Sequence, residues 1–443
     1  MAQLFGTDGI RGIANTELTP ELAVGLGRAL VRTLREEGID RPLVAVGRDP
    51  RPSGEMLEAA LVAGVTSAGG DVLPLGILPT PGVAFLVRLL GANSGVMISA
   101  SHNPVGDNGI KCFGGDGFKL TDQEEERIEE LMQLSDEDRP IGAAIGRLCP
   151  RPGALDAYVD HLVQSGSDLS GLRVVVDCAN GSAATVAPLV LQRLGCDVVA
   201  INTRLDGDHI NDGCGSTYPE VIAAAVREHQ ADVGLTHDGD ADRLLAADAT
   251  GQIVDGDQIL AILADQMHRV GGLDTVVTTV MTNLGFKHAM AARGIDVVET
   301  KVGDRYVLEA MREGGYPLGG EQSGHLILAE HATTGDGILT AVQLLGAVRA
   351  ADSDLASLAV IMRRLPQRLI NVREVDRDRL ADAAELWAAV EKESAKLADR
   401  GRVLLRASGT EPLVRVMVEA DTEDRANEVA VRLADLVRTT LSV

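Results

Sequence analysis

Three stretches of this chain share one pattern: a short run rich in β-branched residues, a polar or glycine-rich turn, and a segment with helical spacing. They are "LVAVGRDPRPSGEMLEAALVAGVTSAG" from Leu43, "RVVVDCANGSAATVAPLVLQRLG" from Arg173 and "TVVTTVMTNLGFKHAMAARG" from Thr275. Each strand segment is apolar throughout, which is typical of strands covered on both faces. The repeated strand–turn–helix order predicts three related α/β domains with mixed, mainly parallel sheets.

The C-terminal part of the chain has a different pattern. "LINVREV" alternates weakly, "ADAAELWAAVEKESAKLADRG" has helical spacing, and "RVLLRASGTEPLVRVMVEA" is typical of two strands around a turn. One apolar face of a final helix would be formed by Ala426, Val429, Ala430, Leu433, Leu436 and Val437. We therefore expect a small α+β domain. Boundaries placed where Pro, Gly and charged residues cluster give predicted domains 1–152, 153–252, 253–366 and 367–443.

Composition argues against a polyanionic or membrane partner. The 443 residues carry a formal net charge of -24 and only 2% aromatic residues. Such a chain repels nucleic acid and anionic lipid, and it lacks the aromatic side chains on which single-stranded bases stack. Five scattered cysteines without a CxxC pair favour reduced thiols, and no signal-like or bilayer-length apolar run is present. We expect a soluble cytoplasmic protein; the sequence leaves its oligomeric state open, a homodimer included.

Three alternating carboxylates in "THDGDADR" predict a metal site. Asp238, Asp240 and Asp242 follow the strand-like "ADVGLT", and strand carboxyl ends are where α/β proteins bind ligands. Clustered carboxylates repel one another unless a cation lies among them, and oxygen ligands suit Mg²⁺, Ca²⁺ or Mn²⁺. An EF-hand loop would place Gly and Glu where Arg243 and Ala249 stand, so that interpretation fails. The alternative is an acidic solvated turn.

A serine ends another apolar run, in "VMISASHNP". No G-x-S-x-G elbow occurs in the chain, so a triad hydrolase is not indicated. His102, Lys111 and Lys119 follow Ser101, and basic groups suit a phosphorylated serine, which carries nearly two negative charges. A phosphoryl oxygen on Ser101 could complete the coordination of a cation held by the three aspartates. The alternative is that the serine only hydrogen-bonds a turn before Pro104.

Two further glycine-containing turns offer groups for a polar ligand. In "GGEQSGH", Glu321 and Ser323 can hydrogen-bond sugar hydroxyls and His325 can move protons, or the polar groups of the turn are incidental. In "RASGTEPLVR", Arg406, Ser408, Gly409, Thr410 and Arg415 would direct donors at an anion, as a phosphate cradle does.

Cationic residues recur beside these turns although the whole chain is acidic. They include Arg11 in "FGTDGIRG" and Lys301 in "TKVGDRYV". These two residues, and Thr7 in the first of these motifs, are further candidates for an anion-binding cleft. The other cationic residues in this set are Arg48, Arg51, Lys111, Lys119, Arg243, Arg305, Arg406 and Arg415. The pattern favours a small anionic ligand in a locally basic site.

Four motifs together carry a family resemblance. "ISASHNP…DNGIK", "DGDADR", "GEQSGH" and "RASGTEPLVR" occur in this order along the chain, which resembles the α-D-phosphohexomutase superfamily. Its bacterial phosphoglucosamine mutase branch is the most similar, through "FGTDGIRG", "INDGCGSTYPE" and Gln322.

The resemblance implies four domains around one cleft and an isomerase that acts by intramolecular phosphoryl transfer. Ser101 would be phosphorylated, with one Mg²⁺ held by that phosphate and by Asp238, Asp240 and Asp242. A 1,6-bisphosphate, of glucose or glucosamine, would be the intermediate or activator. Glu321 and Ser323 would orient the sugar, and the "RASGT" loop with Arg415 would hold the non-reacting phosphate. Arg243 would offset charge on the transferred group.

The implied reaction converts glucosamine 6-phosphate to glucosamine 1-phosphate for UDP-N-acetylglucosamine and cell-wall synthesis. His102, Lys111 and His325 are the candidates for proton transfer, and the sequence does not choose among them. A phosphomannomutase or phosphoglucomutase with the same mechanism is the alternative within the superfamily. A non-catalytic sugar-phosphate sensor is the alternative from another class, but it predicts a lost nucleophile or lost metal ligands, and Ser101 and the aspartates are all present.

Overall fold

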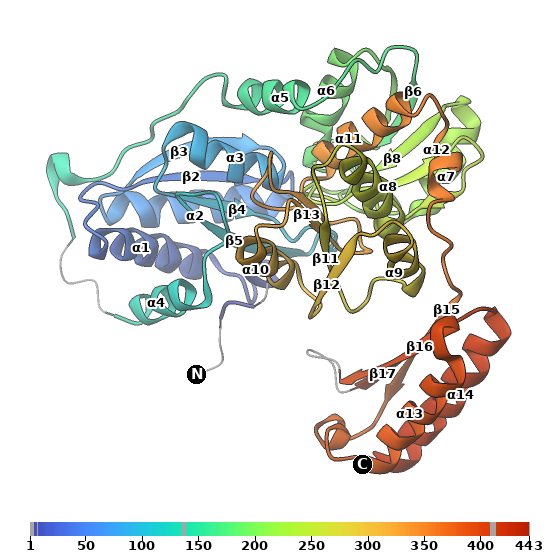
Figure 1. The fold of residues 1–443 in the computed structure, drawn as a ribbon. Helices are drawn as coiled ribbons and strands as arrows, with labels where there is room; N and C mark the ends of the chain where they lie inside the picture. The colour runs from blue at the N-terminus through green and yellow to red at the C-terminus, as the bar shows by residue number, and fades with distance from the viewer. Residues whose placement is uncertain (1–3, 7, 135–138, 408–412, 443) are drawn as a thin grey trace. The chain divides into compact units, whose positions relative to one another are not determined.

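The computed structural model describes residues 4–6, 8–134, 139–407 and 413–442. They form two compact units: Met1–Met281 with Ile295–Ile361, and Thr282–Gly294 with Met362–Val443. The first unit contains three mixed sheets and the second contains one antiparallel sheet (Figure 1). The predicted class, three α/β domains with mixed sheets followed by a small C-terminal α+β domain, is confirmed.

The first sheet has the strand order β1-β5-β4-β2-β3. Strand β2 pairs in parallel with β3 and β4, whereas β5 runs antiparallel to β4 and β1. The strands are β1 (Ile10–Ile13), β2 (Leu43–Arg48), β3 (Asp71–Ile77), β4 (Ser94–Ile98) and β5 (Asp107–Gly114). The helices are α1 (Pro20–Glu36), α2 (Pro52–Ser67), α3 (Thr80–Leu90) and α4 (Asp122–Met132).

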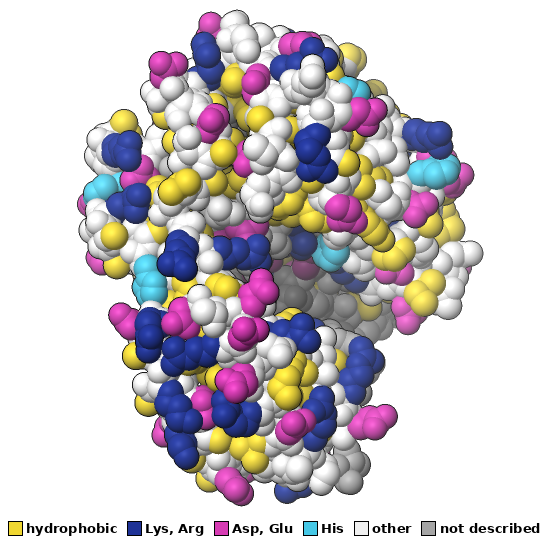
Figure 2. Space-filling model, turned by 90° about the vertical axis from the view of Figure 1, so that its right-hand side faces the viewer, with side chains coloured by type: hydrophobic (Ala, Val, Ile, Leu, Met, Phe, Trp, Pro, Cys, Tyr) yellow, Lys and Arg dark blue, Asp and Glu magenta, His cyan; other side chains and the backbone are white. Residues whose placement is uncertain are grey.

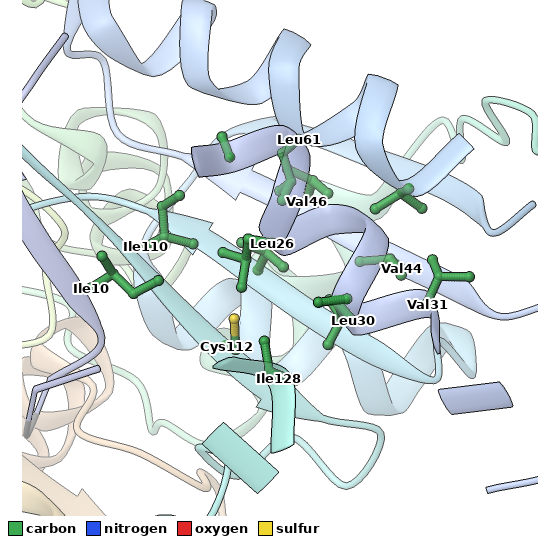
Figure 3. Close-up of a cluster of buried hydrophobic side chains, with 14 of the residues drawn as sticks. Ile10, Leu26, Leu30, Val31, Val44, Val46, Leu61, Ile110, Cys112 and Ile128 are labelled. Carbon is green, nitrogen blue, oxygen red and sulfur yellow. The ribbon is translucent and has the colours of Figure 1, made fainter. Parts of the chain in front are cut away.

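The hydrophobic core around the first sheet is mainly aliphatic, as the scarcity of aromatic residues requires. Leu26 and Leu30 of α1 pack toward Val46 of β2 and Ile110 of β5, and Ile128 of α4 belongs to the same cluster (Figure 3). All five side chains are buried. Burial of such side chains stabilises each by about 1.5–3 kcal/mol relative to exposure, so this cluster anchors the sheet from which the serine loop emerges.

The second sheet has the order β10-β9-β8-β6-β7, with β6 parallel to β7 and β8. Its strands are β6 (Arg173–Asp177), β7 (Asp197–Ile201), β8 (Val233–Thr236), β9 (Leu245–Asp248) and β10 (Ile253–Val254). Its helices are α5 (Ala154–Gln164), α6 (Ala187–Arg193) and α7 (Pro219–His229). The antiparallel pair β8–β9 is joined by the loop that carries the three aspartates.

The third sheet has the order β12-β11-β13-β14, and its last two strands form a hairpin. Its strands are β11 (Thr275–Thr279), β12 (Asp296–Thr300), β13 (Leu318–Gly320) and β14 (Leu326–Leu328). The helices of this part are α8 (Gly256–Arg269), α10 (Asp304–Gly314), α11 (Gly337–Ala350) and α12 (Leu355–Ala359). The "EQSGH" residues connect the hairpin strands.

The C-terminal unit has the sheet order β15-β17-β16, antiparallel throughout. Its elements are α9 (Leu284–Ala291), β15 (Gln367–Arg373), α13 (Ala384–Leu397), β16 (Gly401–Ala407), β17 (Leu413–Ala420) and α14 (Glu423–Thr440). Short 3₁₀ turns lie at Gly142–Ala144, Ser182–Thr185, Arg377–Leu380 and Ala398–Arg400. The apolar face predicted for the last helix is present, since Ala426, Val429 and Leu433 are buried in this unit's core.

The charged side chains on the surface are of both signs. On the face drawn in Figure 2, Lys and Arg side chains are dispersed among Asp and Glu rather than gathered into one extended basic surface. Within the described residues, no helix combines the length and the apolar character needed to span a bilayer.

Candidate active site

The serine loop follows β4 and holds Ser101 in an unusual conformation. Ser101 is buried and has φ +53°, in the left-handed region that side chains other than glycine rarely adopt. Its N–H donates to Ser99 Oγ at 2.9 Å, and Ser99 Oγ donates to Asp49 Oδ2 at 2.6 Å. The surrounding structure therefore stabilises a strained backbone at the candidate nucleophile, as is common at functional sites.

The aspartate loop between β8 and β9 forms a compact acidic cluster. Asp238, Asp240 and Asp242 are buried, and each offers a carboxylate oxygen within 4.8 Å of the others. In the described part of the chain, Oδ1 of each aspartate is buried without a hydrogen-bond partner. Buried carboxylate oxygens without partners are costly, and a hard divalent cation would satisfy all three. The donor set therefore fits the Mg²⁺ that the sequence predicts.

The two loops meet although they come from different sheets. Ser101 Oγ donates to Asp238 Oδ2 at 2.5 Å. Thr80 at the start of α3 donates its hydroxyl to Asp240 Oδ2 at 2.6 Å, and its N–H donates to the Asp240 carbonyl at 3.0 Å. The serine and the aspartates thus lie close enough to share one ion.

Lys111 lies at the centre of β5 and neutralises part of the acidic cluster. Its Nζ lies 3.0 Å from Asp240 Oδ2 and 3.3 Å from Asp242 Oδ2. Burial alone would lower the pKa of Lys111, but Asp240, Asp8 and Asp242 raise it well above its usual value. Burial and then the neighbouring carboxylates raise the pKa of Asp238. Burial also raises the pKa of Asp242, but Lys111, His325 and Arg243 together outweigh it, so that pKa lies well below its usual value.

A cavity of about 450 Å³ opens beside these groups, a size suited to a small-molecule ligand. It is lined by Leu4, Gly6, Asp8, Gly9, Arg11, His102, Asp242, Arg243, Val302, Gly303, Asp304, Glu321 and His325. Five predicted site residues besides Asp242 are therefore brought to one cavity: Arg11, His102, Arg243, Glu321 and His325.

The two cavity histidines differ in environment. His102 Nδ1 lies 3.3 Å from Ser101 Oγ, and burial followed by the charges of Arg243 and Arg11 lowers the pKa of His102 to about 4. His325 Nδ1 lies 3.6 Å from Asp242 Oδ2, while its Nε2 accepts the Gly335 N–H at 3.2 Å. The pKa of His325 is raised because Asp242 and Asp304 outweigh its burial.

Arg243 and the hairpin turn of the third sheet complete the cavity. Arg243 Nε lies 4.0 Å from Asp238 Oδ2 and 3.8 Å from Asp242 Oδ1, with its side chain 24% exposed. Glu321 accepts the Gly303 N–H at 3.1 Å.

Two of the predicted site residues, Ser323 and Lys301, lie outside the set that lines the cavity. Ser323 is half-buried. Lys301 is exposed, with Nζ 5.8 Å from the ring centroid of Tyr306.

Sequence reasoning missed two acidic residues that connect the first and third sheets. Lys119 Nζ lies 2.5 Å from both Asp8 Oδ1 and Asp304 Oδ2. Asp8 Oδ2 also contacts Lys111 Nζ at 3.5 Å and pairs with Arg11. Both acids lie in motifs that also contain predicted cationic site residues, "FGTDGIRG" with Arg11 and "TKVGDRYV" with Lys301. The alternation of charge within those motifs was the signal that could have identified them.

The candidate phosphate loop belongs to the C-terminal unit. Arg406 of β16 and Arg415 of β17 are directly opposite one another in the antiparallel register. Burial and then the charge of Arg415 lower the pKa of Arg406. Two guanidiniums placed side by side favour an anion between or beside them. Ser408, Gly409 and Thr410, like Thr7, lie outside the described residues.

Sequence-family comparison assigns every part of this architecture to one family. Family models described as phosphoglucomutase/phosphomannomutase α/β/α domains I, II and III match residues 2–139, 156–251 and 255–365. The model of the C-terminal domain matches residues 369–436. The chain belongs to the phosphoglucomutase/phosphomannomutase family. The serine and aspartate loops of this phosphohexomutase lie in domains I and II, and the hairpin turn lies in domain III.

Curated relatives match along the whole phosphohexomutase chain. A phosphoglucosamine mutase of Saccharopolyspora erythraea is 58% identical over 99% of each chain, and one of Thermobifida fusca is 55% identical over 100% of each. Among solved structures, a phosphoglucomutase/phosphomannomutase family protein of Burkholderia thailandensis has a TM-score of 0.83 at 25% identity, covering 99% of this chain and 98% of that one.

Proposed function

We propose that this phosphohexomutase interconverts glucosamine 6-phosphate and glucosamine 1-phosphate, as the names of its full-length relatives indicate. The observation that carries the mechanism is the 2.5 Å separation of Ser101 Oγ from Asp238 Oδ2 beside a cavity of hexose-phosphate size. The enzyme is an isomerase of small hexosamine phosphates. We place it in the cytoplasm, where its amino-sugar product would supply UDP-N-acetylglucosamine.

The reaction begins from a phosphorylated Ser101. The free hydroxyl at sugar carbon 1 attacks the phosphorus, the bond from phosphorus to Ser101 Oγ breaks, and the hydroxyl proton passes to a protein base. The product is glucosamine 1,6-bisphosphate. After the intermediate turns in the cleft, Ser101 Oγ attacks the phosphorus at position 6 and the bond from that phosphorus to sugar O6 breaks. O6 takes the proton from the base, glucosamine 1-phosphate leaves, and Ser101 is phosphorylated again.

Asp238, Asp240 and Asp242 would hold Mg²⁺ together with an oxygen of phosphoserine 101. Bound there, the ion supplies electrostatic stabilisation of a transferring phosphoryl group. Arg243 is close enough to the cluster to offset charge on the same group, and buried Lys111 limits the repulsion among the aspartates. His102, Lys111 and His325 remain the candidates for exchanging a proton with a sugar hydroxyl; of these, His102 and His325 line the cavity.

The remaining residues bind substrate. Glu321, with Ser323, orients the sugar hydroxyls, and Arg11 adds positive charge to the cavity that Glu321 lines. Arg406 and Arg415, with Ser408, Gly409 and Thr410, bind the phosphate that is not reacting. Exclusion of water protects the phosphoserine from hydrolysis. The predicted domain boundaries and a homodimer remain predictions of the sequence.

A substrate panel tests the function. Purified protein with Mg²⁺ and catalytic bisphosphate is assayed on the 6-phosphates of glucosamine, glucose and mannose. We expect the highest kcat/KM on glucosamine 6-phosphate. A preference for mannose or glucose phosphate would instead assign the chain to a phosphomannomutase or phosphoglucomutase activity, and binding without turnover on all three would indicate a sensor.

A further inference from the structure

The loop between β7 and α7 contains the "INDGCGSTYPE" motif, to which the proposed reaction gives no role. Backbone N–H groups of this loop donate hydrogen bonds to other parts of domain II. Asn211 N–H donates to the Ala179 carbonyl at 2.9 Å, Gly215 N–H donates to Asp177 Oδ2 at 2.9 Å, and Ser216 N–H donates to the His237 carbonyl at 2.8 Å. Since His237 directly precedes Asp238, the last of these bonds holds the loop against the start of the aspartate loop.

The same loop reaches across to the serine loop of domain I. Asn211 Nδ2 donates to the Ser101 carbonyl at 2.8 Å and to the Asn103 carbonyl at 3.1 Å. Gly239 of the aspartate loop fits closely behind this contact, because a Cβ there would lie 2.6 Å from the Ser101 carbonyl oxygen and 2.8 Å from Ile210 Cδ1. The two functional loops and Asn211 therefore form one packed junction.

Arg51 binds the same carbonyls from within domain I. Its terminal nitrogen Nη2 donates to the Ser101 carbonyl at 3.1 Å and to the Asn103 carbonyl at 2.8 Å, and Nη1 donates to the Asp107 carbonyl at 3.1 Å. The Arg51 side chain is fully buried and pairs with Asp49 at 2.9 Å. The serine-loop backbone is thus held by one donor residue from its own domain and by one from the domain of the metal ligands.

We propose that Asn211 is a positioning residue for phosphoryl transfer, which sets the distance between Ser101 and the aspartate loop. Ser101 has a left-handed backbone that must be stabilised by its neighbours. Because Asn211 belongs to domain II, its two hydrogen bonds link the serine backbone to the same body that carries Asp238. A misplacement of about 1 Å in a reacting group costs about 10²-fold in rate. The inference rests on the proposed mutase function.

The test compares Asn211→Gly with Asn202→Gly. Both asparagines lie in loops of domain II and have positive φ, +58° and +50°, so glycine fits either backbone without strain. Asn202 Nδ2 donates to Asp177 Oδ1 at 3.0 Å, a contact within domain II. Each variant thus removes a carboxamide from a left-handed loop position, but only Asn211→Gly removes donors to the serine loop.

We expect Asn211→Gly to lower kcat on glucosamine 6-phosphate by about 10–100-fold and to raise the Mg²⁺ concentration for half-maximal activity. KM should change little, because Glu321, Arg406 and Arg415 are untouched. Asn202→Gly should keep kcat and the Mg²⁺ requirement near wild-type values. Equal kcat values and equal Mg²⁺ requirements for the two variants would overturn the inference.

Asn211→Asp provides a second variant of unchanged size. It replaces two N–H donors by an acceptor that faces two carbonyl oxygens, so it should lower kcat at least as much as Asn211→Gly while the melting temperature shows a folded protein. A folded Asn211→Asp with wild-type kcat would also overturn the inference. An inactive wild-type enzyme in the substrate panel would instead contradict the proposed function, so the two failures are distinguishable.

Discussion

Ser101 Oγ and Asp238 Oδ2 lie 2.5 Å apart, although 137 positions separate the two residues in the chain. Each follows a strand of a different sheet, β4 for the serine and β8 for the aspartate. The contact places the serine hydroxyl at the edge of the buried acidic cluster, within reach of a cation held by the three aspartates.

Ser101→Ala should abolish mutase turnover. Removing the proposed nucleophile should lower kcat on the order of 10³-fold or more, because the proposed phosphoenzyme is formed on this hydroxyl. Ser94→Ala is the matched control, since Ser94 is a buried serine of β4, the strand that leads into the serine loop, and its hydroxyl donates to the Phe113 carbonyl. Retained turnover in Ser101→Ala, measured with fresh bisphosphate, would refute the phosphoserine role.

Asp240→Asn should weaken Mg²⁺ binding. The change keeps the size of the side chain and removes one of three clustered charges, so the Mg²⁺ concentration for half-maximal activity should rise about tenfold or more. Titration calorimetry with Mg²⁺ alone measures the same effect without substrate. Asp248→Asn alters a carboxylate of β9 outside the cluster and should leave both values unchanged. An unaltered Mg²⁺ affinity in Asp240→Asn would reject the metal site.

Arg415→Ala should chiefly weaken substrate binding. Loss of a charge-assisted hydrogen bond of about 1.5–3 kcal/mol corresponds to a rise in KM of roughly 10–100-fold. Arg432→Ala removes a half-exposed arginine of the same unit, paired with Glu393 at 3.7 Å, and serves as control. Steady-state kinetics on glucosamine 6-phosphate give both constants. A KM that stays at the wild-type value in Arg415→Ala would count against the phosphate cradle.

Leu26→Ala should destabilise domain I without altering the chemistry directly. Leu26 is fully buried in the aliphatic core beneath the first sheet. Truncation should lower the free energy of unfolding by about 2–5 kcal/mol through lost burial and a residual cavity. Denaturant unfolding at a temperature where the variant is folded measures the change. A change below about 1 kcal/mol would show that this core relaxes to fill the space.

The strands that carry the fold could be predicted from the sequence because each is a run rich in β-branched residues that is followed by a turn and a segment with helical spacing. The three repeated segments begin at Leu43, Arg173 and Thr275, and the structure has β2, β6 and β11 starting at these residues. The short edge strands were harder to predict from the sequence. Strands such as β10 (Ile253–Val254) and β14 (Leu326–Leu328) have too few residues for alternation to distinguish them from turns.

The candidate site was predictable where one motif carried several polar groups of one kind. The aspartate loop is such a motif. The residues alone left Ser101 as either its partner or part of a simple turn, and the family resemblance favoured the first. Contacts made by single residues were not predictable, because a sequence pattern contains no distances between remote positions. Thr80 is typical of a helix start, yet it hydrogen-bonds Asp240, and Asn211 gave no sign that it would contact the carbonyl of Ser101.

The central claim is that Ser101 carries the transferred phosphoryl group while the aspartate loop holds the metal. It is tested most directly by incubating dephosphorylated enzyme with radiolabelled glucosamine 1,6-bisphosphate, with and without Mg²⁺, and mapping the labelled peptide. We predict Mg²⁺-dependent label on Ser101 that is discharged by glucosamine 6-phosphate and is greatly reduced in Asp240→Asn. Label on another residue, or efficient turnover with no label on Ser101, would contradict the claim.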